Sequence, residues 1–337
     1  MKRAALLVAC LALLGVGAGC TREPRLAGDT ARLTLADGAR AEAGERGRDL
    51  RAVKGVTVFH DGARVRLLGG EADLALAGGA MLGLRQGSEI VVGRRPTLVS
   101  GMVLVVPSDP TPLVIRAGDA TVTALGPARV ERDLAVSAAS YRSGLRMASA
   151  GRRLLVPALR QATVASLGEV PADPEPLDYD DGNAWDRRYL GAAVQLGSEL
   201  EARSRGFSAS LRRGAGHTPG FYRLLLPALE SEPGFDTVAL PEEQPPGETL
   251  VGTTLALAGR RGSFATRYSE VFAFRAEGAN WGLVALDQGV DQAPVPVVET
   301  VDVAIGRAPL AFAPPPSTET ASAPDPSPAP RSSDRPT

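Results

Sequence analysis

Short segments that alternate apolar and polar residues dominate the first half of the chain. Alternation with a period of two places successive side chains on opposite faces of a β-strand. Val65 and Leu67 are therefore predicted to point inward, and their neighbours Arg64 and Arg66 outward. We expect an all-β domain over residues 51–170, built as a multi-strand sandwich, a roll or a solenoid. The segments that carry the pattern are ARVRLLGG, ADLALAGG, MLGLRQG, SEIVVGRR, TLVSGMVLVV, LVIRAGD and ATVTALG.

Glycines separate several of these segments at steps of eight or nine residues. A tight turn between strands needs a residue that tolerates a positive φ, and glycine does so without strain. The spacing therefore predicts a turn at each of Gly62, Gly70, Gly79 and Gly87.

The segment Leu113–Val130, LVIRAGDATVTALGPARV, is interpreted as one strand–turn–strand unit. Val122 is predicted to face the core, whereas Thr121 and Thr123 face away from it. A polar site built on these two threonines is the competing hypothesis.

The β segments together resemble the FecR-type sensor domain of bacterial envelope proteins. The resemblance rests on GGEADLALAGGAMLGLRQGSEIVV, on LVSGMVLVV, and on the stretch LVIRAGDATVTALGPARVERDLAVSAASYRSGLRMASAGRRLLVPALRQAT. It covers about a third of the chain, and Pro127 departs from it because the family usually has Thr there. The resemblance implies an extracytoplasmic domain that carries a signal or a scaffold surface. Founding members of the family also have a cytoplasmic segment and a transmembrane helix that regulate a sigma factor. In that place, we expect this chain to have a cleavable signal peptide instead.

The hydrophobic period changes after the acidic, Pro-rich segment EVPADPEPLDYDDGN. A helical stripe is predicted for Trp185, Tyr189, Ala193, Leu196 and Leu200, with Asn183 as its N-cap, Arg203 and Arg205 in its last turn and Gly206 at its end. Further helices are predicted after Thr218, through ETLVGTTLALAG, and between Ser263 and Gly278. Together these helices predict a small α-helical bundle over residues 177–308.

The N-terminus has the features of a bacterial lipoprotein. Lys2 and Arg3 precede an apolar run that is too short to span a bilayer, and the small residues of GVGAGC precede Cys20. We expect residues 1–19 to be a signal peptide, Cys20 to carry lipid, and residues 20–50 to form a flexible tether. An ordinary secreted protein with an accidental cysteine is the alternative. Residues 311–337, rich in Pro, Ser, Thr and Ala, are expected to be disordered.

Neither the composition nor the motifs of the chain indicate nucleic-acid binding, metal binding or catalysis. The chain has 37 basic and 38 acidic residues, so its net charge gives no reason to expect a nucleic-acid partner.

His60 and His217 are interpreted as surface turn residues. DYDDGN departs from a calcium loop, because counting from Asp178 places Gly182 at a ligand position and Tyr189 at the twelfth place. Neither a metal, a cofactor nor a catalytic motif is predicted, and the aromatic cluster around Phe264, Tyr268, Phe272, Phe274 and Trp281 is interpreted as bundle core rather than a ligand groove.

The sequence thus predicts a non-enzymatic protein on the outer face of the bacterial cytoplasmic membrane or of another envelope membrane. Its FecR-like domain would serve as a binding, scaffold or sensor module. Its partners would be the membrane, through the lipid on Cys20, and an envelope protein or the cell wall. A cell-wall glycan or peptidoglycan binder and an envelope hydrolase without a recognisable motif are the alternatives. Phe59 and Tyr141 are the only aromatic residues between Val53 and Ala165, which disfavours sugar stacking.

Overall fold

The computed structural model describes residues 26, 28–165, 168–180, 182–211, 218–241, 243–290 and 294–311. The chain divides after Pro174 into two compact units, within the Pro-rich segment where the hydrophobic period changes. We call them the β unit and the helical unit. The signal-peptide region, Cys20 and the tail from residue 312 onward lie outside the described residues, as does His217.

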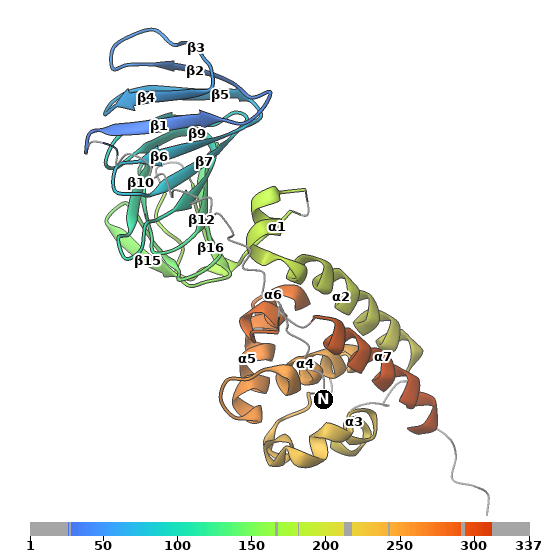
Figure 1. Cartoon of the computed structure of the whole chain (residues 1–337). Helices are drawn as coiled ribbons and strands as arrows, with labels where there is room; N and C mark the ends of the chain where they lie inside the picture. Colours follow the sequence, from blue (N-terminus) through green and yellow to red (C-terminus); the bar gives the residue numbers. More distant parts are fainter. Residues whose placement is uncertain are drawn as a thin grey trace, which may run out of the picture. The chain divides into compact units, whose positions relative to one another are not determined.

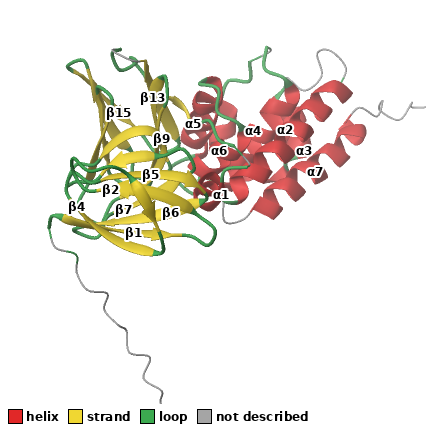
Figure 2. Ribbon diagram, turned by 90° about the horizontal axis from the view of Figure 1, so that it is seen from above, coloured by secondary structure: helices red, strands yellow, loops and turns green. Residues whose placement is uncertain are grey.

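Strands make up the regular structure of the β unit, drawn from blue to green in Figure 1 and in yellow in Figure 2. Their bounds are β1 Thr30–Leu35, β2 Arg40–Gly44, β3 Arg51–Val53, β4 Val56–His60, β5 Arg64–Gly69, β6 Glu71–Leu76, β7 Met81–Arg85, β8 Glu89–Val91, β9 Thr97–Val106, β10 Leu113–Ala117, β11 Ala120–Ala124, β12 Ala128–Arg132, β13 Ala135–Ser140, β14 Leu145–Ser149, β15 Arg152–Val156 and β16 Arg160–Ala165.

The pairing of these strands forms two sheets that share β9. Sheet A has the order β4–β1–β6–β7–β9–β12–β13–β16, and all its pairs are antiparallel. Sheet B has the order β3–β2–β5–β8–β9–β10–β11–β14–β15, in which only β9 and β10 run parallel. The first half of β9 belongs to sheet B, and its second half to sheet A. The chain therefore builds a two-layer structure by passing repeatedly from one sheet to the other.

Glycine makes the transfer of β9 between the sheets possible. Gly101 has a φ of 81°, and a Cβ there would lie 2.6 Å from the Gly87 carbonyl oxygen. Any larger residue would therefore clash with the backbone of a neighbouring turn. The four turns predicted from glycine spacing are confirmed, since Gly62, Gly70, Gly79 and Gly87 all have positive φ values.

The core of the β unit lies between the two sheets. Val65, Leu67 and Val122 are 0% exposed, as the alternation predicts. All three belong to a single apolar cluster to which strands of both sheets contribute residues. Thr121 and Thr123 are half-buried on the opposite side of their strand.

The expected tether over residues 20–50 is wrong for its second part. β1 and β2 lie within it, and their inward residues Ala31, Leu33, Ala41 and Ala43 are buried in the same core. The alternation is present there too, but alanine marks the inward positions of β2 and contributes little hydrophobicity. The β unit therefore begins at Thr30 rather than at residue 51.

Helices make up most of the second unit, drawn from yellow-green to red in Figure 1 and in red in Figure 2. Its elements are the short strand β17 Glu175–Pro176, then α1 Ala184–Leu190, α2 Ala192–Ser210, α3 Pro219–Leu225, η1 Pro227–Ser231, η2 Pro233–Thr237, α4 Pro246–Ala258, α5 Phe264–Ala276, α6 Trp281–Asp287 and α7 Pro294–Ala311.

Three of the predicted helix starts are confirmed. The side chains of Asn183, Thr218 and Ser263 accept hydrogen bonds from backbone N–H groups of the first turns of α1, α3 and α5. The single helix expected from Trp185 to Gly206 is instead two helices. Gly191 separates them with a φ of 55°, and α2 continues past Gly206 to Ser210.

Small residues bring the helices of the second unit into close contact. A Cβ on Gly282 of α6 would lie 1.9 Å from the Ala193 carbonyl oxygen of α2, and one on Gly247 of α4 would lie 1.9 Å from the Ser204 carbonyl oxygen. α2 therefore packs directly, backbone to backbone, on both α4 and α6.

Candidate binding surface

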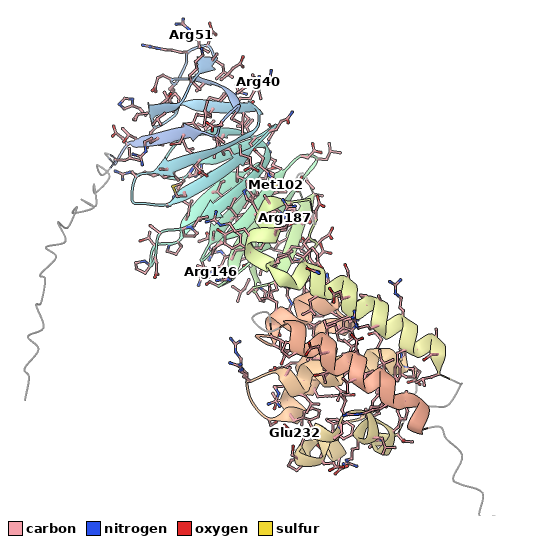
Figure 3. The ribbon with its side chains drawn as sticks, turned by 45° about the vertical axis from the view of Figure 1, so that its right-hand side comes forward. Arg40, Arg51, Met102, Arg146, Arg187 and Glu232 are labelled. Atoms are coloured by element: carbon pink, nitrogen blue, oxygen red, sulfur yellow. The ribbon has the colours of Figure 1, made fainter. Side chains whose placement is uncertain are left out.

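The outward side of sheet B in the second half of the β unit is exposed and rich in arginine. We call it the arginine face. Strands β10, β11, β14 and β15 form it, and Arg146 on β14 is labelled in Figure 3. Its outward residues are Val114, Arg116, Thr121, Thr123, Arg146, Ala148, Arg153 and Leu155.

The strand register arranges these residues in two rows across the sheet. One row runs from Arg116 through Thr121 and Ala148 to Arg153. The other runs from Val114 through Thr123 and Arg146 to Leu155. Directly paired strands lie about 4.8 Å apart, so each arginine is within a few strand spacings of the other two.

The three arginines of this face are not neutralised. Arg116, Arg146 and Arg153 are exposed, and none of the eight outward residues is acidic. Within the described ranges, no carboxylate lies within ion-pair distance of their guanidinium groups; the one salt bridge of β15 joins Glu169 to the neighbouring Arg152. This surface therefore presents three cations to solvent.

The first half of the same sheet is different. Glu89 on β8 is only 5% exposed, and it pairs with Arg64 and, at 2.7 Å, with Arg66 on β5. Glu42 on β2 lies directly opposite Arg66 on its other side. Two carboxylates thus match Arg64 and Arg66, whereas the three arginines of the arginine face have no carboxylate among its outward residues.

The sequence divides its charge between the two units. Residues 30–165 carry nineteen basic and twelve acidic side chains, a formal charge of +7, whereas residues 175–311 carry twelve basic and nineteen acidic ones, a formal charge of −7. The near-zero total therefore hides a basic β unit. The near-neutral charge of the whole chain conceals this surface, and the net charge of each domain taken separately is the sequence signal that points to it.

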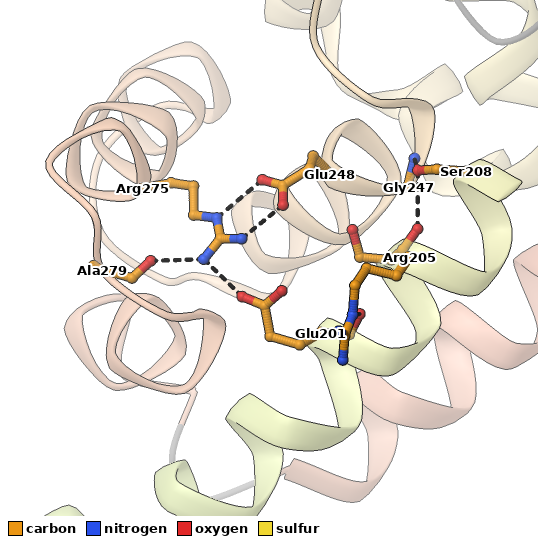
Figure 4. A network of polar contacts seen from close by, with 8 residues as sticks. Glu201, Arg205, Ser208, Gly247, Glu248, Arg275 and Ala279 are labelled. Atoms are coloured by element: carbon orange, nitrogen blue, oxygen red, sulfur yellow. Dashed lines mark hydrogen bonds and ion pairs between the residues drawn. The ribbon is translucent and has the colours of Figure 1, made fainter. Parts of the chain in front are cut away.

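The main polar cluster of the helical unit is structural. Arg275 on α5 donates to Glu248 on α4 at 2.9 and 2.6 Å, to the Ala279 carbonyl oxygen at 2.9 Å, and pairs with Glu201 on α2 at 2.7 Å (Figure 4). Its guanidinium also lies 4.7 Å from the centre of the Trp281 ring. Burial alone would lower the pKa of Arg275, but the two carboxylates outweigh it and raise that pKa. The group is fully engaged in joining four helices.

Replacing Arg275 with Gln is expected to lower the stability of the helical unit by about 2–4 kcal/mol, because Glu201 and Glu248 would be left without their cation. Thermal unfolding followed by circular dichroism would measure the loss. Arg203→Gln is the control. It removes pairs with Asp302 and Glu199, whose side chains are 51% and 38% exposed and can be solvated, so it should cost less than about 1 kcal/mol. Equal losses in the two variants would contradict a structural role specific to Arg275.

The hollows of the described surface are modest. In the β unit, one of about 270 Å³ lies among Thr30, Asp61, Leu76 and Arg94, and another of about 90 Å³ lies beside Asp119 and Arg132. In the helical unit, α3, η1, α4 and α7 leave an apolar hollow of about 430 Å³, lined mainly by Leu226, Pro227, Leu257 and Val303. Among the described residues, no group of three or more His, Cys, Asp or Glu side chains is placed to hold a metal ion.

The structure places the other residues singled out from sequence in scaffold roles. His60 is exposed at the end of β4, with its Nδ1 3.5 Å from Glu45. Within DYDDGN, the Asp180 carboxylate accepts from the Gly182 N–H at 2.8 Å, and Asn183 caps α1. Asp181 is outside the described residues. The predicted N-cap of α1 at the end of this segment is therefore confirmed.

The predicted aromatic cluster is core. Trp281 is 0% exposed, and successive ring contacts connect it through Phe272 and Tyr268 to Phe264. Burial raises the pKa of the Tyr268 hydroxyl to about 12, which keeps it neutral at physiological pH. These aromatic residues therefore form part of the packed core of the helical unit.

No protein-family model matches the chain, and no curated protein matches it. Two solved structures are similar to part of it, both described as a "putative anti-sigma factor" from Parabacteroides distasonis. One is 17% identical, with a TM-score of 0.30, over 35% of this chain and 60% of its own. The other is 15% identical, with a TM-score of 0.29, over 40% of this chain and 70% of its own. The matched region spans less than two thirds of the first structure.

Each helix within the described ranges is too short or too polar to cross a bilayer.

Proposed function

We propose that this chain is an exported, lipid-anchored and non-enzymatic protein of the cell envelope, whose β unit is a FecR-like binding or sensor module. The arginine face is the observation that carries the proposal. Three exposed arginines that form no ion pair with a carboxylate of the described residues make a surface that attracts an anionic partner. The ordered FecR-type segments and the lipoprotein features before Cys20 support the envelope location.

Two alternatives receive less support. A glycan binder stacks sugars on exposed aromatic rings, but Phe59 and Tyr141 are 5% and 2% exposed. A hydrolase needs a nucleophile and a base within hydrogen-bond reach of each other. The sequence has no recognisable motif of this kind, and the side chains of the polar cluster around Arg275 pair with one another to join helices.

Replacing Cys20 with Ser is expected to release the chain from membranes. Two or more acyl chains hold a protein firmly, because each buried methylene contributes about 0.8 kcal/mol. The measurement is the fraction of protein in the membrane pellet after a wash at about 1 M salt, where charge interactions are screened beyond about 3 Å.

Cys10→Ser is the matched control, since Cys10 lies within the expected signal peptide and should leave the pellet fraction unchanged. A Cys20→Ser chain that remains in the salt-washed pellet like the parent would show that lipid on this residue is not the anchor.

A further inference from the structure

We propose that the arginine face binds the anionic headgroups of a lipid bilayer, and so lays the β unit against the membrane to which the chain is anchored. This inference rests on the proposed function for its location, and it specifies the partner of the same surface. Three observations favour a lipid surface over other anions.

The first observation is the charge of the face itself. Arg116, Arg146 and Arg153 lie on one side of one sheet, so a flat surface can meet all three at once. The corresponding outward residues of sheet A include both Arg129 and Glu131, so that side offers no excess of cations. A layer of anionic headgroups is a flat array of negative charges, and it therefore matches the three arginines on the outward side of sheet B.

The second observation is the apolar content of the face. Leu155 is 58% exposed and lies directly opposite Arg146, and Val114 is in the same row. A large apolar side chain among arginines suits the boundary between headgroups and acyl chains, where peripheral proteins bury apolar residues next to basic ones. Single-stranded nucleic acid would instead favour aromatic stacking platforms, and none of the eight outward residues is aromatic.

The third observation is the distance from the expected anchor. β1 begins at Thr30, so only nine residues lie between its first residue and Cys20, which makes ten Cα–Cα steps. A fully extended chain spans at most about 3.6 Å per residue, which limits this connection to about 36 Å. A lipid on Cys20 therefore keeps the β unit within one domain diameter of the bilayer, where even a weak surface contact is favoured by high effective concentration.

Vesicle co-sedimentation tests the proposal without the lipid anchor. The chain beginning at Thr21 lacks Cys20 and the apolar run before it, and the residues removed lie outside the described structure. We expect it to bind vesicles of phosphatidylcholine mixed with phosphatidylglycerol, and not vesicles of phosphatidylcholine alone. Binding should vanish at about 1 M salt.

The triple variant Arg116→Gln, Arg146→Gln, Arg153→Gln is expected to lower the partition onto anionic vesicles on the order of 100-fold, because each basic residue near such a surface contributes about 1 kcal/mol. The control triple Arg48→Gln, Lys54→Gln, Arg94→Gln removes the same charge from exposed loop positions of the β unit and should retain most of the binding. Thermal melting of both variants checks that neither has lost its fold.

Three results would overturn the proposal. They are a parent chain that does not bind anionic vesicles, equal losses in the two triple variants, and binding to single-stranded DNA or heparin that anionic vesicles do not displace. The last result would assign the face to a soluble polyanion. Because these assays use a chain without Cys20, they remain informative whether or not Cys20→Ser releases the protein from membranes.

Discussion

Replacing Val122 with Asp is expected to unfold the β unit. Val122 is 0% exposed in the centre of β11, and it pairs with Ile115 on β10 and Met147 on β14. An unpaired carboxylate at this position would lose its hydration without gaining a partner, at a cost of several kcal/mol. Domains of this size are stable by only about 5–15 kcal/mol, so a large part of that margin would disappear. Thermal melting and far-ultraviolet circular dichroism would measure the effect.

Thr121→Ala and Thr123→Ala are the matched controls, because both threonines lie on the same strand but on the arginine face. Each should change stability by less than about 1 kcal/mol. A Val122→Asp protein that melts like the parent would disprove the inward assignment of this strand. A stable double-threonine variant that no longer binds anionic vesicles would instead give the threonines a part in the binding surface.

Replacing Gly282 with Ala is expected to cost the helical unit about 2–4 kcal/mol, although it adds a single methyl group. The new Cβ would lie 1.9 Å from the carbonyl oxygen of Ala193 and 2.8 Å from its carbonyl carbon. Both atoms belong to the backbone of α2 and cannot rotate away, so α2 and α6 must separate. Overpacking of a core typically costs about 1–3 kcal/mol and occasionally more, and a 1.9 Å approach to backbone atoms places this variant at or above the upper end of that range. Denaturant titration of the variant would give the loss.

Gly206→Ala on α2 is the control, since a Cβ there meets nothing within 4 Å. Alanine is the better helix former, so this variant should be unchanged or more stable by roughly 0.5–1 kcal/mol. If both glycine variants lost equal stability, the cost would come from replacing a helical glycine as such, and not from the contact between α2 and α6.

Alternation predicted most of the β unit correctly, because the inward positions of β5, β6, β7, β10 and β11 are occupied by Val, Leu and Ile as well as by Ala. It failed for β2, whose inward residues Ala41 and Ala43 are small enough to resemble a tether in composition. The order of strands in the sheets could not be predicted from the alternation either. β1 pairs with β4 and β6, and not with β2, which follows it in sequence. Such pairings depend on how the two layers close, which no local pattern records.

The sequence predicts only part of the arginine face. Local alternation places Thr121, Thr123 and Arg116 outward, but it does not bring Arg146 and Arg153 beside them. The register of β11 with β14 does so, over a separation of more than twenty residues, and the hairpin of β14 with β15 then adds Arg153. In the helical unit, the stripe from Trp185 to Leu200 was correctly assigned as helical, but the break at Gly191 depends on one residue with positive φ.

The shared strand β9 has a consequence for the modularity of the β unit. Its ten residues border the first half of both sheets through β7 and β8, and the second half through β10 and β12. A second half without Thr97–Val106 would expose two open strand edges, which invite pairing with other chains. Neither half can therefore be excised, exchanged or duplicated as an independent part. Because both halves need β9, evolution can only keep or lose the two-layer structure as a whole.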